Sequence, residues 1–340
     1  MKLTALWTLR RMQHQVFRQI VEEWEDDFAT ELGLPLKDVS GCEKRANGRF
    51  GVLRRRFPAG VLPWDDGGRI TSPRGRNCAL AFLIWPPGHA ASYWVQPDVV
   101  PIVIDCWRPH LAAAPEVFAR SPFVFVTNRE VERELAATTL GSRVRYLPLS
   151  VSARHLSGNI PPKTVDLIQV GRRNPLLHDW ALEYVRRRPG TTYLFADTSG
   201  TWPRWLNAAG ETIQVDATRA SYWALLRSSR ISLVSAPGID GGEARTGGLN
   251  PVTPRFYESA AARCHLIGRF PADGADFETN RVGTVCPNVH TFDEFSAAAD
   301  RARSYPVDTA ALDRFLIGHT TAEVARRARD ELAARWPIAA

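Results

Sequence analysis

The feature that most restricts the fold of this chain is the alternation of short, wholly apolar runs with stretches of helical pattern from residue 78 onward. The clearest runs cover residues 78–85, 99–106 and 123–127, and the strand pattern restarts at 165–170. Runs of this length suit strands that are buried on both faces, and their alternation with helices is typical of βα units around a parallel sheet. The pattern therefore predicts an α/β fold.

The chain length and its turn residues predict two domains. Further strands are expected at 145–150, 192–196, 211–215, 231–235 and 265–268, and helices at 11–32, 128–140, 176–188, 219–228, 254–263 and 320–335. At about 100–200 residues per domain, 340 residues suggest two domains. A segment with Gly158, Pro161 and Pro162 separates two strands. It predicts a first domain over 1–150, a linker over 151–163, a second domain over 164–317 and a helical C-terminal segment over 318–340.

Arginine dominates the charge of the chain. There are 43 Lys and Arg residues against 36 Asp and Glu, a net charge of +7, and lysine occupies only positions 2, 37, 44 and 163. Guanidinium groups match phosphate oxygens and stay charged at any cellular pH. This balance favours a phosphate-bearing partner and leaves nucleotide, nucleic acid and anionic membrane open.

Several classes of protein lose support from the sequence. The five cysteines form no CxxC pair and no Cys/His cluster at zinc spacing, which predicts buried thiols in a reducing compartment. No window approaches the roughly 18 apolar residues of a spanning helix, and no leader pattern is present. The expected localisation is cytoplasmic, with peripheral attachment to a membrane left open. The signatures of dinucleotide-binding dehydrogenases, P-loop NTPases, serine hydrolases and zincins are absent.

Residues 250–268, NPVTPRFYESAAARCHLIG, form the most informative segment. Thr253 can cap a helix whose first residue is Pro254. Free backbone amides and the positive end of the helix dipole then face the glycine-rich loop 237–248 that precedes the helix. This arrangement suits a bound phosphate.

Four further residues of this region are candidates for binding. Gly247 and Gly248 end the glycine-rich loop, and Arg255 and Glu258 share one face of the helix that follows. The arginine can meet a phosphate while the carboxylate accepts hydrogen bonds from sugar hydroxyls. The alternative is an ordinary Arg–Glu surface pair on a capped helix.

The run TPRFYESAAARCHLIG resembles the nucleotide-sugar-binding element of the GT-B glycosyltransferases, in particular of the CgeB-like and group 1 families. VDLIQVGRRN is similar to the opening of the second domain in those families, and FVFVTNREVEREL followed by VRYLPLSV resembles the end of the first. The C-terminal helix resembles one that crosses back to the N-terminal domain. The resemblance implies two Rossmann-like domains facing across a cleft. It also implies a hexosyltransferase that moves a sugar from a UDP- or GDP-type donor to a hydroxyl without a metal or other cofactor.

The resemblance also implies roles for individual residues. Glu258 takes the position of a glutamate that binds the donor ribose, and Arg172 or Arg173 the position of a basic residue on the diphosphate. Asn250 stands near the donor sugar, at the position of the first glutamate of the family's Glu-x7-Glu motif, whose second glutamate corresponds to Glu258. Arg263 replaces the glycine that ends the helix, so the end of this helix is expected to differ.

Candidates for catalysis come from the first domain. Asp105 follows the apolar run 99–104, and the carboxyl ends of parallel strands are where α/β sites collect. His110 and His89 are further candidates, and each of the three has an ordinary structural alternative, a helix cap or an exposed side chain. The nearest sequence to a metal-binding Asp-x-Asp is Asp65-Asp66-Gly67-Gly68, which is typical of an exposed turn.

The sequence leaves the acceptor and two other functions open. A glycan, a lipid-linked glycan, a protein or a nucleic acid can each supply the acceptor hydroxyl, since a net charge of +7 favours any polyanion. The departures at Asn250 and Arg263 suit a non-catalytic, partner-binding or nucleic-acid-binding protein on a degenerate GT-B scaffold. A nucleotide-sugar epimerase of the same fold is a third alternative.

Overall fold

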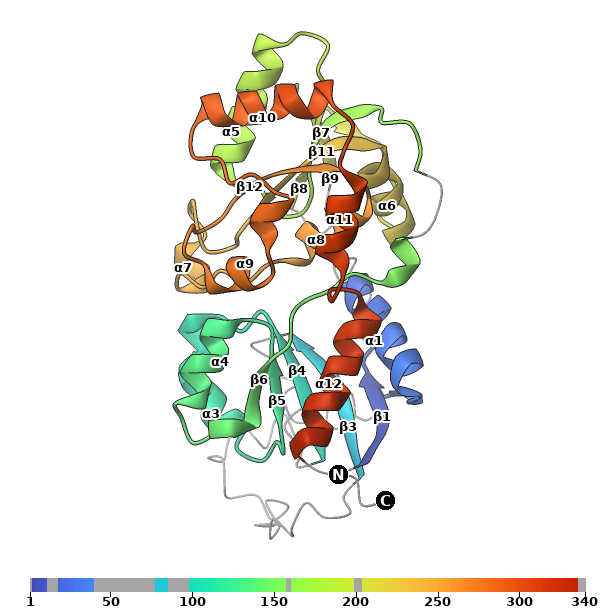
Figure 1. Cartoon of the computed structure of the whole chain (residues 1–340), viewed down its shortest axis with the longest axis vertical. Coiled ribbons are helices and arrows are strands. Elements are labelled where there is room, and N and C mark those ends of the chain that lie inside the picture. Colours follow the sequence, from blue (N-terminus) through green and yellow to red (C-terminus); the bar gives the residue numbers. More distant parts are fainter. Residues whose placement is uncertain are drawn as a thin grey trace, which may run out of the picture. The chain divides into compact units, whose positions relative to one another are not determined.

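The computed structural model describes residues 2–10, 18–39, 77–84, 98–156, 160–198 and 204–335. These residues form two compact units (Figure 1). Unit 1 comprises the chain up to residue 127, residues 131–147 and the chain from residue 325 onward, and unit 2 comprises residues 128–130 and 148–324. Each unit has one six-stranded sheet, in agreement with the predicted α/β fold.

The sheet of unit 1 is parallel throughout its described strands, in the order β2-β1-β3-β4-β5-β6. The predicted apolar runs are confirmed as β3, β4 and β5, and every residue of β4 is buried. The strands are β1 (Lys2–Thr8), β2 (Leu36–Asp38), β3 (Asn77–Ile84), β4 (Val99–Ile104), β5 (Val124–Val126) and β6 (Val144–Tyr146).

The described α-helices that accompany this sheet are α1 (Gln19–Leu32), α3 (Ala114–Val117), α4 (Arg129–Ala136) and α12 (Thr321–Arg335). Short 3-10 helices cover Arg108–Ala113 and Gly141–Arg143. The apolar stripe of α1 packs on β3, where Phe28 meets Phe82 with ring centroids 5.1 Å apart. Gly33 ends α1 in the left-handed conformation, as a glycine after a helix readily does.

Helix α12 lies within unit 1 although it follows unit 2 in the chain. It pairs Arg326 with Glu31 of α1, and it places Arg327 over the ring of Tyr146 in β6. Figure 1 draws α12 in red among the blue and green elements of unit 1. None of the described helices is both long and apolar enough to cross a membrane.

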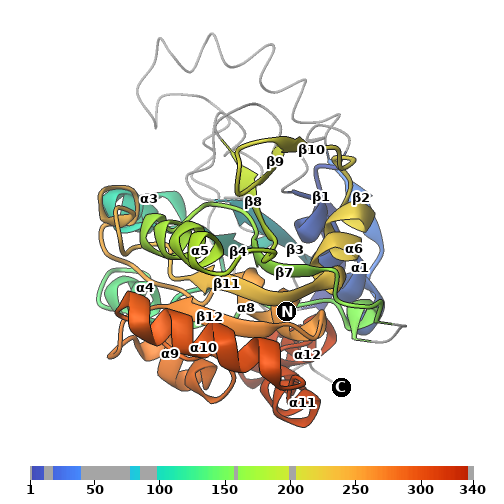
Figure 2. The same cartoon turned by 90° about the horizontal axis from the view of Figure 1, so that it is seen from above.

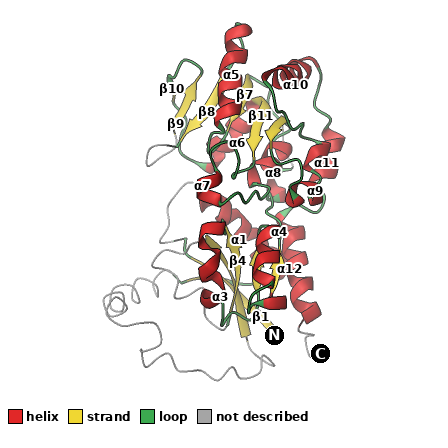
Figure 3. Ribbon diagram, turned by 90° about the vertical axis from the view of Figure 1, so that its left-hand side faces the viewer, coloured by secondary structure: helices red, strands yellow, loops and turns green. Residues whose placement is uncertain are grey.

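The sheet of unit 2 has the order β10-β9-β8-β7-β11-β12, which Figure 2 shows from above. Strands β8, β7, β11 and β12 are parallel, whereas β9 and β10 form an antiparallel edge (Figure 3). The strand expected at 211–215 is reduced to two residues. The strands are β7 (Val165–Gln169), β8 (Tyr193–Asp197), β9 (Arg204–Asn207), β10 (Thr212–Ile213), β11 (Ser229–Ser235) and β12 (His265–Arg269).

The helices of unit 2 are α5 (Pro175–Arg187), α6 (Arg219–Ser228), α7 (Glu243–Thr246), α8 (Pro254–Ala261), α9 (Ala275–Thr279), α10 (Phe292–Ser304) and α11 (Thr309–Leu316). Short 3-10 helices cover Ala153–His155 and Val282–Thr284. Helices α5 and α10 pack together on the sheet through fully buried rings, with the centroids of Tyr184 and Phe295 6.0 Å apart. This core fixes the position from which α5 begins.

The end of α8 corrects one expectation. Arg263 was expected to change the way in which the helix ends, yet it adopts the left-handed conformation, with φ of 58°. Its amide donates to Ala260 O and the Cys264 amide donates to Ser259 O, the two bonds of the Schellman motif that a glycine usually closes. The guanidinium group of Arg263 pairs with Asp313 of α11 at 2.6 Å, so the side chain has an anchor that a glycine lacks.

Candidate functional site

A pocket of about 240 Å³ lies within unit 2 at the carboxyl ends of β7 and β11. These two strands are neighbours in the sheet. The chain passes from β7 to β8 on one side and from β11 to β12 on the other. Ligands of open α/β sheets bind at such a switch point, which makes this pocket the candidate site.

The loop between β7 and α5 forms one wall of the pocket. Arg172 and Arg173 are exposed and line it. Asn174 caps α5 because its Oδ1 accepts a hydrogen bond of 3.0 Å from the Leu177 amide, and Pro175 occupies the first helical position. The positive end of a 13-residue helix thus opens on the pocket beside two arginines.

Arg255 of α8 reaches the same loop. Gly171 has φ of +73°, and a Cβ placed on it would collide with Nε, Cζ and Nη2 of Arg255. The guanidinium group therefore lies against the Gly171 backbone and lines the pocket. The glycine is required here for two reasons, its left-handed backbone and the close approach of Arg255.

The N-terminus of α8 also lines the pocket. Thr253 is the N-cap, as predicted, and Pro254 is the first helical residue. The Thr253 side chain does not cap the helix, however. Its Oγ1 is buried and has no hydrogen-bond partner among the described residues, although Thr253 lines the pocket and is only 9% exposed. A buried hydroxyl without a partner is costly, and a ligand in the pocket can satisfy it.

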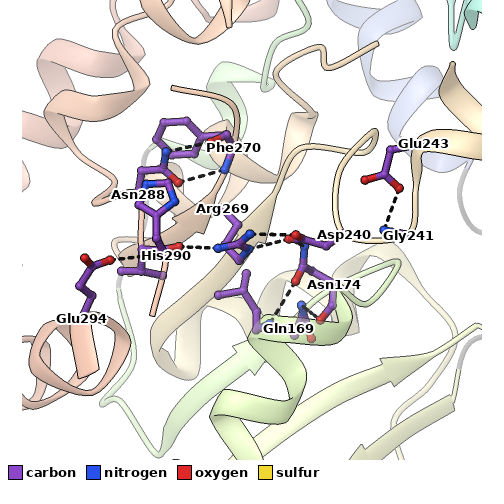
Figure 4. A network of polar contacts seen from close by, with 12 residues as sticks. Gln169, Asn174, Asp240, Gly241, Glu243, Arg269, Phe270, Asn288, His290 and Glu294 are labelled. Carbon is purple, nitrogen blue, oxygen red and sulfur yellow. Dashed lines mark hydrogen bonds and ion pairs between the residues drawn. The ribbon is translucent and has the colours of Figure 1, made fainter. Parts of the chain in front are cut away.

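Asp240 is the acidic residue of the pocket lining, and two partners hold it. Arg269, the last residue of β12, donates from Nε to Oδ2 at 2.5 Å and from Nη2 to Oδ1 at 2.8 Å, and Asn174 Nδ2 donates to Oδ2 at 2.7 Å. Figure 4 shows both partners pointing at the carboxylate. Burial acts to raise the pKa of Asp240, but the hydrogen bonds from Arg269 and Asn174 outweigh it and lower that pKa.

His178 contacts Arg173 and links it to Tyr193 by hydrogen bonds. Tyr193 Oη donates to Gln169 Oε1 at 3.1 Å, so His178 Nδ1, 2.9 Å from Tyr193 Oη, is left to donate to that oxygen. His178 Nε2 then accepts from Arg173 Nη1 at 3.5 Å. Burial, and next the charge of Arg173, lower the pKa of His178, so the neutral form fits this chain of hydrogen bonds.

Three residues expected to bind the donor shape the glycine-rich loop instead of lining the pocket. Asn250 Oδ1 accepts from the Gly238 amide at 2.9 Å, and its Nδ2 donates to Gly248 O at 2.7 Å. Gly247 and Gly248 both have left-handed backbones, with φ of 64° and 81°, and Gly247 ends the short helix α7. Asn250 therefore tethers the two ends of this loop to each other.

Glu258 lies deep in α8, 2% exposed, and does not line the pocket. Its carboxylate pairs with Arg219 of α6 and accepts a hydrogen bond of 2.6 Å from Tyr222 Oη. Burial, and then the charge of Glu258, raise the pKa of Tyr222, which keeps that hydroxyl a donor. The alternative of a surface pair with Arg255 is therefore not what holds the Glu258 carboxylate.

The catalytic candidates belong to unit 1. Asp105 is exposed directly after β4 and has φ of 57°, a left-handed conformation that is uncommon for a residue with a Cβ. His110 is exposed in the 3-10 helix after it. His89, Asp65 and Asp66 lie outside the described residues. Among those that are described, no group of three or more His, Cys, Asp or Glu side chains is placed to hold a metal ion.

The sequence analysis missed the pair formed by Asp240 and Arg269. The two residues are 29 positions apart, and neither stands in a motif that pairs them. The available signals were the acid within the glycine-rich segment GIDGG and an arginine directly after a predicted strand. Both are weak until the register of the sheet places the ends of β11 and β12 side by side.

Solved structures show which fold the two units form. No protein-family model matches the sequence, and no curated protein matches it. A glycosyltransferase from Rickettsia africae ESF-5 is similar over 99% of this chain and 98% of its own, with 9% sequence identity and a TM-score of 0.50. This likeness shows the GT-B fold, which the sequence resemblance implied.

Two further structures are similar at lower scores. The pneumococcal O-GlcNAc transferase GtfA, in complex with UDP and GlcNAc, matches 75% of this chain with 13% identity and a TM-score of 0.48. The UDP-GlcNAc 2-epimerase from Methanocaldococcus jannaschii matches 98% of this chain and 100% of its own, with 10% identity and a TM-score of 0.45. The chain spans just over half of the length of the chains that it matches in GtfA and in a GtfA/B complex, 56% and 57%.

Proposed function

We propose that this chain transfers a sugar from a nucleotide-diphosphate sugar to a hydroxyl acceptor and binds the donor diphosphate in the pocket of unit 2. The observation that carries the proposal is the convergence of Arg172, Arg173, Arg255 and the Thr253 hydroxyl on one pocket. Two helix N-termini open on the same space. Guanidinium groups and helix N-termini are the groups with which proteins bind phosphates.

The charge of the pocket fits an anionic leaving group. In the transfer, the bond between the anomeric carbon and the diphosphate oxygen breaks, and its electron pair stays on that oxygen. Donors that are already in position stabilise the developing charge without reorganising. Among the described residues of the lining, Asp240 is the acidic one, and Arg269 neutralises it, so the three arginines that face the pocket set its sign.

The remaining roles follow the sequence resemblance and stay part of the proposal. The acceptor oxygen bonds to the anomeric carbon and gives its proton to a base, for which Asp105, His110 and His89 are the candidates. Glu258, whose carboxylate is buried against Arg219 and Tyr222, stays the candidate for the ribose hydroxyls on the resemblance alone. The acceptor is a glycan, a lipid-linked glycan or another hydroxyl compound. We place the chain as a divergent member of the CgeB-like and group 1 glycosyltransferases.

A binding experiment with matched variants tests the diphosphate site. UDP and GDP are expected to raise the Tm of the wild-type protein, and Arg255→Ala is expected to weaken the better ligand by about tenfold or more, because one charge-assisted hydrogen bond is lost. Arg186→Ala is the control, since Arg186 is exposed near the end of α5 and pairs with Glu183. A wild-type Tm that neither nucleotide changes, or equal binding by both variants, would refute the assignment.

Turnover distinguishes an enzyme from a binding protein on the same fold. Release of the nucleoside diphosphate from UDP- and GDP-sugars is measured with and without added glycan acceptors. Transfer or hydrolysis above background supports the proposed activity, whereas nucleotide binding without release of diphosphate favours the non-catalytic alternative. Free sugar that is changed in configuration would indicate the epimerase.

A further inference from the structure

Asp240 has a position that the binding of phosphate does not explain. Among the described residues that line the pocket, it alone carries a carboxylate. Because Arg269 neutralises its charge, this carboxylate adds nothing to the attraction of the three arginines for a phosphate, and an anion site alone does not need it. The backbone of Asp240 is left-handed, with φ of 51°. This conformation is unfavourable for a residue with a Cβ, and residues that adopt it cluster at functional sites.

The hydrogen bonds of Asp240 leave one acceptor site open. An ionised carboxylate has about four lone-pair sites, two on each oxygen. Oδ2 accepts from Arg269 Nε at 2.5 Å and from Asn174 Nδ2 at 2.7 Å, whereas Oδ1 accepts, among the described residues, only from Arg269 Nη2 at 2.8 Å. The remaining site is therefore on Oδ1, in a residue that lines the pocket.

The partners of Asp240 also fix what it can recognise. Arg269 donates two hydrogen bonds to the carboxylate (Figure 4). Its Nη1 also donates to Val289 O at 2.9 Å, which fixes the arginine in place. Asn174 ties the same carboxylate to the N-terminus of α5. A carboxylate held ionised in one orientation accepts a hydrogen bond and donates none.

We infer that Oδ1 of Asp240 accepts a hydrogen bond from a hydroxyl of the sugar that the diphosphate carries, and that Asp240 thereby selects the donor sugar. The inference rests on the proposed function, because the arginines must hold the diphosphate for the sugar to reach Asp240. The pocket then recognises two features of one ligand, an anion at Arg172, Arg173, Arg255 and Thr253 and a hydrogen-bond donor at Asp240. A nucleoside diphosphate supplies the first feature, and a nucleotide sugar supplies both.

The test compares each nucleotide with its sugar conjugates in wild type, Asp240→Asn and a control. UDP, GDP, UDP-glucose, UDP-N-acetylglucosamine and GDP-mannose are titrated by calorimetry. Asp300→Asn is the control, since Asp300 is another arginine-paired carboxylate of unit 2 and does not line the pocket. Asp240→Asn is expected to weaken the preferred nucleotide sugar about tenfold and the free nucleotide less than twofold. Asp300→Asn is expected to leave both unchanged.

Deoxy and deoxyfluoro analogues of the preferred sugar identify the hydroxyl. Removal of the hydroxyl that contacts Asp240 is expected to weaken binding to the wild type but to leave the affinity of Asp240→Asn unchanged. Such non-additive losses of affinity are the result that a direct contact produces. If Asp240→Asn does not fold, Asp240→Glu displaces the same carboxylate by one methylene group and is compared in the same way.

The outcomes separate the inference from the proposed function. An equal loss for nucleotide and nucleotide sugar in the Asp240 variant, or an analogue series that affects variant and wild type alike, overturns the inference and makes Asp240 a structural residue or a contact to the nucleoside. In both cases, the diphosphate site stands. If no nucleotide binds to the wild type, the proposed function fails, and the sugar contact fails with it.

Discussion

A single methyl group at Gly171 is expected to weaken nucleotide binding at the diphosphate site while leaving the fold intact. The Cβ of Gly171→Ala would occupy the space of the Arg255 guanidinium group. That group is the far end of a flexible side chain, so it can swing away, and the loop need not move. The direct cost to folding is then the left-handed backbone of an alanine, about 1–2 kcal/mol. For a domain of the size of unit 2, this lowers the Tm by about 2–8 °C.

Gly190→Ala separates the backbone cost from the collision. Gly190 has φ of +86°, but a Cβ there meets nothing within 4 Å. Both variants are expected to lose similar stability in thermal denaturation. Only Gly171→Ala is expected to lose nucleotide affinity, by about ten- to a hundredfold if one arginine–phosphate hydrogen bond is lost.

A double variant tests the cause of that loss. Because the methyl group acts by displacing Arg255, the Gly171→Ala/Arg255→Ala protein is expected to bind the nucleotide as weakly as Arg255→Ala alone. Calorimetric titration of UDP or GDP measures all four proteins. Wild-type affinity in Gly171→Ala would refute the reasoning, and so would two losses that simply add.

Two further predictions concern stability. Lys163 Nζ donates to Arg227 O at 2.8 Å and to Ala262 O at 3.0 Å, at the C-terminal ends of α6 and α8. Lys163→Met is therefore expected to lower the free energy of unfolding by about 1–3 kcal/mol in urea denaturation. An unchanged free energy of unfolding would contradict this role. Burial, and then the charge of Arg173, lower the pKa of His178 in the folded protein from its ordinary value of 6.5. As the pH drops below about 6.5, the unfolded chain therefore binds a proton at His178 before the folded protein does, and the folded protein loses stability. Denaturation between pH 7 and pH 5 should show a smaller slope for His178→Asn than for the wild type, and equal slopes would exclude the effect.

The order of the elements was largely predictable because the strands are buried on both faces. Runs such as that of β4 leave little choice but a parallel strand between helices. The first strand was missed because the sequence KLTALWT of β1 is neither a continuous apolar run nor a strict alternation of polar and apolar residues. The antiparallel hairpin of β9 and β10 was missed for a related reason, since strands of four and two residues carry too few side chains for a period.

The site was predictable where one local segment creates it. Thr253 and Pro254 mark a helix start in the sequence itself, and the pocket does contain Thr253 and Arg255 together with Arg172 and Arg173. The sequence places Glu258 on the helix that became α8, but its partners Arg219 and Tyr222 belong to α6. No pattern in the sequence predicts a contact between those two helices. Asn250 shows the same limit, because its two hydrogen bonds depend on how the loop closes.

The position of α12 has a consequence for the synthesis of this protein. Helix α12 contributes the buried residues Val324, Ala325, Ala328 and Leu332, and from residue 325 onward it belongs to unit 1, about 180 residues after β6. At roughly 5–20 residues per second, the ribosome adds it about 9–36 s after the rest of unit 1. Unit 2 is nearly continuous in the chain and has its own core before then. Unit 1 is therefore the last unit to be completed. During those roughly 9–36 s, chaperones can bind the apolar surface that α12 later covers.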